Sequence, residues 1–198
     1  MYRILKEGCH CYVFIPTKQA GMFITAFEEK FVLMNILSTR TYTSSTYLKN
    51  NFSFNNQLVL YLSKGQAKRL NKVDFMPTSE SWLKDKRNKN PHPFTYQYPA
   101  FLPLFSNEKT TANNNAKTGR HPCAKSIPFE EILIQLSSNE GDVVCDMFMG
   151  GGTTALAAIN TNRQYIGFEL NKEAYDRCIE RIEETTAKYR QEEMAIAC

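Results

Sequence analysis

The sequence lacks any apolar run near the roughly 18 residues that a membrane-spanning helix needs. Residues 1–8 also lack the apolar segment of a secretory signal. Histidine is scarce, with three in 198 residues, and the six cysteines show no paired zinc-ligand spacing. Cys9, His10 and Cys11 are adjacent, which is too close for the usual zinc knuckle. These absences predict a cytoplasmic protein with reduced thiols and no metal site.

What is present is typical of a globular protein, with 42% apolar and 22% charged residues. The net charge of +4 is unevenly spread. Between Lys64 and Lys89, eight basic residues face three acidic ones, a local charge of +5. Such a segment suits a phosphate backbone, although a solvated loop without a partner would have the same composition.

The chain falls into three parts, 1–62, 63–120 and 121–198. In the first, apolar and β-branched runs predict strands, and an apolar stripe predicts a helix capped by Thr17. The strands are expected over 9–15, 31–41 and 57–62, and the helix over 18–30. In the second part, prolines, aromatics and basic residues interleave without periodicity, which predicts an insertion with little regular structure.

The third part returns to regular order. It predicts a helix over 128–137, a buried strand over 142–148, a helix over 153–161 and a strand over 164–170. Asn171 is expected to cap a final helix through Tyr189, with a buried stripe of Tyr175, Cys178, Ile179 and Ile182. The strand–glycine–helix–strand order predicts a βαβ unit with parallel strands.

Three glycines, Gly150 to Gly152, join the first of these strands to its helix. Glycines let a backbone approach a ligand closely, and the helix start offers unpaired N–H groups to an anionic group. The second strand ends in Glu169, where a carboxylate would bind ribose hydroxyls. The pattern predicts a site for an adenosine with free ribose hydroxyls. A plain tight turn is the alternative, and a dinucleotide fingerprint fits only loosely because Ala155 replaces its third glycine.

Several segments together resemble one family. HPCAKS from His121, DMFMGGGTT from Asp146 and YIGFEL from Tyr165 are similar to motifs of the DNA methyltransferases that modify adenine N6 or cytosine N4. The order resembles the permuted subgroup, whose cofactor half is C-terminal. MYRILKEGCHCYVFI and QLVLYLSKG resemble strands of its catalytic half. Ser126 and Met147 stand where the family usually has proline.

The resemblance implies an α/β, Rossmann-like fold that binds S-adenosylmethionine. The cofactor-binding residues it implies are Asp146, Phe148, Gly150, Gly152, Thr153, Glu169, His121 and Lys125. Residues 63–120 would be the target-recognition insertion and 121–198 the cofactor half. The target base would be extruded from DNA. The residues expected to contact DNA are Lys68, Arg69, Lys72, Lys84, Lys86, Arg87 and Lys89.

The family's catalytic tetrapeptide, a polar residue followed by Pro-Pro-aromatic, is absent from the sequence. It is expected upstream of Arg3, and Asn90 to Phe94 is a look-alike inside the insertion. Residues 1–62 would then be the remainder of the catalytic half, and the sheet would lack a central strand. A fragment of a longer enzyme, a split enzyme completed by a second polypeptide, and a non-catalytic remnant all fit. An RNA or protein methyltransferase is a weaker alternative.

Overall fold

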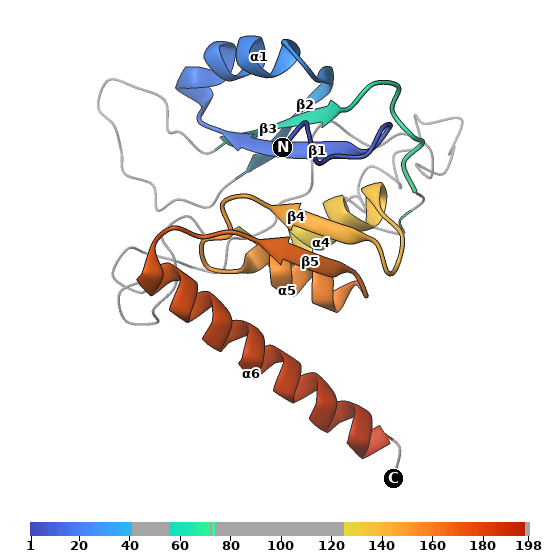
Figure 1. Cartoon of the computed structure of the whole chain (residues 1–198), viewed down its shortest axis with the longest axis vertical. Helices are drawn as coiled ribbons and strands as arrows, with labels where there is room; N and C mark the ends of the chain where they lie inside the picture. The colour runs from blue at the N-terminus through green and yellow to red at the C-terminus, as the bar shows by residue number, and fades with distance from the viewer. Residues whose placement is uncertain (41–55, 72, 74–124, 197–198) are drawn as a thin grey trace, which may run out of the picture. The chain divides into compact units, whose positions relative to one another are not determined.

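The computed structural model describes residues 1–40, 56–71, 73 and 125–196 (Figure 1). The chain divides into two compact units, Met1–Ser106 and Asn107–Cys198. Each helix in the described ranges is too short or too polar to cross a bilayer. Both units contain strands and helices, as expected for an α/β protein, and the two kinds of element alternate in the second unit.

The first unit is built on a three-stranded sheet. Its strands are β1 (His10–Ile15), β2 (Val32–Arg40) and β3 (Asn56–Ser63). β3 lies between the other two and is antiparallel to both, with Tyr12 of β1 opposite Tyr61 of β3. All three strands therefore form within two residues of their expected limits.

One helix covers the apolar face of this sheet. α1 (Ala20–Glu28) follows a short 3-10 turn, η1 (Thr17–Gln19), and its Phe23 and Phe27 pack against buried Ile15 and Leu60. The predicted Thr17 cap is wrong. Thr17 lies inside the 3-10 turn, so the residue preceding α1 is Gln19, which makes no side-chain capping bond.

The second unit contains the predicted βαβ arrangement. β4 (Val143–Asp146) and β5 (Gln164–Gly167) are parallel, with Asp146 opposite Gly167. α5 (Thr153–Asn160) connects them. Two further helices belong to the unit, α4 (Ile127–Ser137), with proline in its first turn, and α6 (Lys172–Ile196).

The helices cover one face of the two-stranded sheet. Val144 of β4 packs with Ile134 of α4 and with Ala157 and Ala158 of α5. The predicted burial of the whole first strand is wrong, because Val143 is 54% exposed, and β4 has four residues in place of the expected seven. Alternate side chains of a strand point to opposite faces, so covering one face leaves the others exposed.

The prediction for the apolar stripe of α6 is right for two of its four residues. Cys178 and Ile182 are buried as expected, and Ala174 extends the same row at i, i+4 spacing. Tyr175 and Ile179 were expected to be buried with them but are exposed. They lie one position further round the helix than the buried row, and so they face away from the core.

Asn171 caps α6 as predicted, since its Oδ1 accepts a hydrogen bond from the Ala174 amide at 2.9 Å. We expect Asn171→Ala to destabilise the helix start by about 1 kcal/mol, the usual value of such a cap. Asn171→Asp keeps the acceptor and should stay near the wild type. Hydrogen exchange at the first-turn amides of α6 measures this difference. Equal protection in the two variants would contradict a capping role.

Candidate functional site at the glycine turn

The two parallel strands are locked together where they end. The Phe168 amide donates to the Asp146 carbonyl at 3.0 Å, and the Met149 amide donates to the Phe168 carbonyl at 2.8 Å. The glycine turn therefore begins beside the end of β5. This backbone pairing brings Gly150 and Glu169, which are 19 residues apart in the sequence, to the same edge of the sheet.

Glu169 bridges the turn and the start of α6. Its Oε2 accepts a hydrogen bond from the Gly150 amide, and its Oε1 accepts one from the Asn171 amide, both at 2.8 Å. A carboxylate has about four acceptor positions. Two amide bonds are therefore compatible with further hydrogen bonds from ligand hydroxyls.

Asp146 organises the other side of the turn. Its Oδ1 accepts from the Phe148 amide at 2.9 Å, and its Oδ2 accepts from the Thr154 hydroxyl at 2.6 Å. The carboxylate thus ties the end of β4 to the first turn of α5. Both of its oxygens act within the turn, which gives Asp146 a structural role beside the predicted cofactor role.

Two of the three glycines adopt backbone conformations that favour glycine, and one of them also lacks room for a side chain. Gly150 has φ of 52° and Gly152 has φ of 78°, a region that side chains rarely adopt. A Cβ at Gly152 would also lie 2.7 Å from the Cys178 Sγ of α6. Arg181 of α6 donates to the Gly151 carbonyl at 2.8 Å. The last helix, α6, therefore contacts the turn at both Gly151 and Gly152.

The exposed surface of the turn combines acidic and apolar groups. Phe148 is 83% exposed at the turn, and Phe168 is 52% exposed after β5. Burial raises the pKa of the Cys178 thiol, Arg181 opposes this rise, and Glu169 and Asp146 add to it by smaller amounts. Two carboxylates beside exposed aromatic rings provide negative charge and an apolar surface at one place.

The other predicted site residues are distributed as follows. Thr153 begins α5 with its side chain buried, and Lys125 lies two residues before α4. In the first unit, Lys68 and Arg69 are exposed, and Lys68 contacts the Cys9 thiol. The remaining predicted residues lie outside the described ranges; these are His121, Lys72, Lys84, Lys86, Arg87 and Lys89.

Three residues that support the glycine turn were not predicted from the sequence. Thr154 and Arg181 hydrogen-bond to the turn, and Glu130 of α4 is buried and interacts with Thr154. Their sequence spacing carries no such indication, because each comes from a helix whose packing is set by the tertiary fold. The one available indication in the sequence was Thr154, a hydroxyl residue in the first turn of the helix that follows the glycines.

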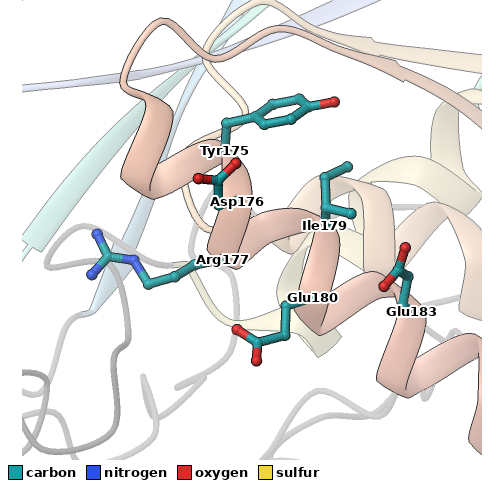
Figure 2. A pocket seen from close by; sticks show the side chains of 6 residues that line it. All are labelled: Tyr175, Asp176, Arg177, Ile179, Glu180 and Glu183. Carbon is teal, nitrogen blue, oxygen red and sulfur yellow. The ribbon is translucent and has the colours of Figure 1, made fainter.

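A shallow hollow lies elsewhere, on the outer face of α6. Figure 2 shows that its six lining side chains all project from this one helix. They are Tyr175, Asp176, Arg177, Ile179, Glu180 and Glu183. A hollow formed by a single helix is open to solvent and offers a ligand no opposing wall. Its Glu183 is therefore a suitable control for the carboxylates of the turn.

The parallel strands, glycine turn and acidic strand end define a Rossmann-like α/β methyltransferase fold, and solved structures agree. The M1.HpyAVI–SAM complex is 25% identical with a TM-score of 0.66, covering 90% of this chain and 76% of that one. The cytosine-N4-specific PvuII DNA methyltransferase, at 17% identity, has a TM-score of 0.63 and coverages of 87% and 64%. The predicted fold class is thereby confirmed.

The chain belongs to the DNA methylase family N6_N4_Mtase, whose model matches residues 1–180. This match confirms the resemblance. The type II methyltransferase M.HpaI of Haemophilus parainfluenzae is 27% identical over 183 residues, which are 92% of this chain. The match covers 56% of that relative, so the chain spans about half of its length.

Proposed function

We propose that this chain provides the S-adenosylmethionine-binding half of a DNA methyltransferase that methylates the exocyclic amino group of adenine or cytosine. The hydrogen bond between the Gly150 amide and Glu169 carries the proposal. It places an acidic strand end against a glycine turn that opens a helix, the arrangement that binds adenosine. The family match and the M1.HpyAVI–SAM complex support the same cofactor.

The residues at the turn fit this cofactor chemically. Glu169 would accept hydrogen bonds from the ribose hydroxyls, and the start of α5 at Gly152 and Thr153 would favour the methionine carboxylate. Exposed Phe148 would contact the adenine ring. Asp146 and Glu169 add negative charge, which suits a sulfonium. Lys125 and His121 are proposed to line the methionine end.

DNA is the proposed second substrate. Residues 63–120 would form the target-recognition region, with the basic residues Lys68 and Arg69 contacting phosphates. The target amino nitrogen would attack the cofactor's methyl carbon as the carbon–sulfur bond breaks. S-adenosylhomocysteine leaves, and the amino group loses a proton. Activity on DNA requires access to DNA, and we propose that the protein acts in the cytoplasm.

The missing Pro-Pro-aromatic motif has a consequence for this proposal. Its polar side chain and prolyl carbonyl would accept hydrogen bonds from the target amino group, and its aromatic ring would stack on the base. Methyl transfer would need these groups from elsewhere, and we propose either sequence upstream of Met1 or a second polypeptide as their source. We propose that residues 1–198 alone bind the cofactor weakly and transfer no methyl group.

Calorimetry and a methyl-transfer assay test the proposal together. We expect S-adenosylmethionine and S-adenosylhomocysteine to bind the full chain at one shared site. NADP should not bind, because Glu169 would repel its 2′-phosphate. With tritiated cofactor and duplex DNA, we expect no transfer. Failure of both adenosyl compounds to bind would refute the cofactor site, and robust transfer would refute the need for additional catalytic groups.

A further inference from the structure

A buried carboxyl lies in α4, the helix that packs against α5. Glu130 sits in the first turn of α4 and is 7% exposed. Its Oε2 is buried and has no hydrogen-bond partner among the residues that the structure describes. Burying a polar oxygen without a partner is costly, and burying a charge costs much more. Such a carboxyl is favoured in its neutral form.

Thr154 stands between this carboxyl and Asp146. The Thr154 hydroxyl interacts with Glu130 and donates to Asp146 Oδ2 at 2.6 Å. That distance is typical of a hydroxyl bonded to an ionised carboxylate. A hydroxyl has a single proton to donate. With that proton directed at Asp146, Glu130 can bond to Thr154 only by donating a proton of its own.

The charges around Glu130 allow it to carry that proton near neutral pH. Burial raises the pKa of Glu130 to about 7, the Thr154 hydroxyl lowers it and the negative Asp146 raises it. Lys125, before α4, and Arg181, on α6, lower it by smaller amounts. The helix N-terminus also favours the ionised form. Burial outweighs these opposing effects.

We propose that Glu130 is a positioning residue for the cofactor turn, which it holds in place by donating a proton to Thr154. Thr154 then keeps its own proton on Asp146, and Asp146 remains aligned on the Phe148 amide. Glu130 would act through these groups without touching the cofactor. The inference rests on the proposed function, since it assigns this support to the S-adenosylmethionine site.

Loss of the Glu130 proton has a defined consequence. An ionised Glu130 competes with Asp146 for the one Thr154 proton, and the two carboxylates repel each other. Asp146 then loses a hydrogen bond that fixes the turn, so cofactor affinity falls as pH rises through neutrality. A direct electrostatic role would have the opposite effect, because an ionised Glu130 would attract the sulfonium.

The test compares Glu130→Gln with the wild-type chain in S-adenosylmethionine titrations from pH 6.0 to 8.5. Glutamine keeps the shape, donates a hydrogen bond to Thr154 and does not ionise. The ratio of wild-type to variant Kd removes the titration of the cofactor's own amino group. We expect a ratio near 1 at pH 6.0 that rises several-fold by pH 8.5. A flat or falling ratio would overturn the proposal.

Three further variants complete the design. Glu130→Leu also lacks an ionisable group and should show the same ratio trend, which keeps the test usable if glutamine misfolds. Glu140→Gln, at an exposed glutamate, should match the wild type at every pH. In a Thr154→Val background, replacing Glu130 should change the pH dependence much less than in the wild-type chain, because only the direct repulsion between Glu130 and Asp146 remains. An undiminished change there would show that Glu130 acts without Thr154.

A measurement without cofactor separates this inference from the proposed function. A carboxyl whose pKa is raised in the folded state binds its proton more tightly there, so stability falls as pH rises between the unfolded and folded pKa values. The opening equilibrium of α5, measured by hydrogen exchange, should therefore become more favourable by up to about tenfold per pH unit toward pH 7. Glu130→Gln should remove this dependence. Its presence without any cofactor binding would refute the proposed function alone.

Discussion

Replacing Glu169 by alanine is expected to weaken S-adenosylmethionine binding by roughly 10- to 100-fold. Hydrogen bonds to a charged group contribute about 1.5–3 kcal/mol, and 1.4 kcal/mol corresponds to tenfold in Kd. The substitution removes the proposed ribose acceptor. It also leaves the Gly150 and Asn171 amides without the carboxylate that orients them. Calorimetry on the full chain measures the change.

Two matched variants make this result interpretable. Glu183→Ala removes an exposed carboxylate from the hollow on α6 and should change the Kd less than twofold (Figure 2). Glu169→Gln keeps one acceptor oxygen and should lie between the wild type and Glu169→Ala. Equal losses for Glu169→Ala and Glu183→Ala would remove Glu169 from the site and leave an unspecific charge effect.

Gly152→Ala should produce the largest loss of stability at the turn. A side chain at φ of 78° costs about 1–2 kcal/mol. Its Cβ would also lie 2.7 Å from the Cys178 Sγ, and such overpacking costs about 1–3 kcal/mol. Hydrogen exchange at α5 and α6 amides reports the stability of this unit directly.

Gly141→Ala is the control for the backbone component of this loss. Gly141 has φ of 81°, and a Cβ there would meet no atom of the described residues within 4 Å. The difference between the two variants therefore isolates the contact with Cys178. Adding Cys178→Ala to Gly152→Ala should recover part of that difference, because it removes the Sγ atom that the new Cβ would meet. If the destabilisations of the two single variants simply add in the double variant, the contact between Cβ and Sγ does not contribute to the loss.

Local patterns were sufficient to predict most of the elements and the placement of Glu169 beside the glycine turn. Alternating and continuous apolar runs located β1, β2 and β3 within two residues. Asn171 was recognised as a cap because capping depends on a side chain and amides three residues away. The glycines and Glu169 were identified because a βαβ unit brings successive strand ends to one edge. Each of these inferences depends on short-range geometry, and the family match supports the reading they led to.

Burial and support were decided only by the tertiary structure. The sequence could not show that β4 has one uncovered face, because an apolar run looks the same whether one or both faces are packed. It also could not show that Asp146 bonds to Thr154, that Cys178 closes on Gly152, or that Glu130 lies buried beside them. These contacts join separate helices, and their partners are selected by packing in three dimensions. The sequence by itself determined which groups stand at the ends of the parallel strands and at the glycine turn, and the packing of α4, α5 and α6 determined how those groups are held.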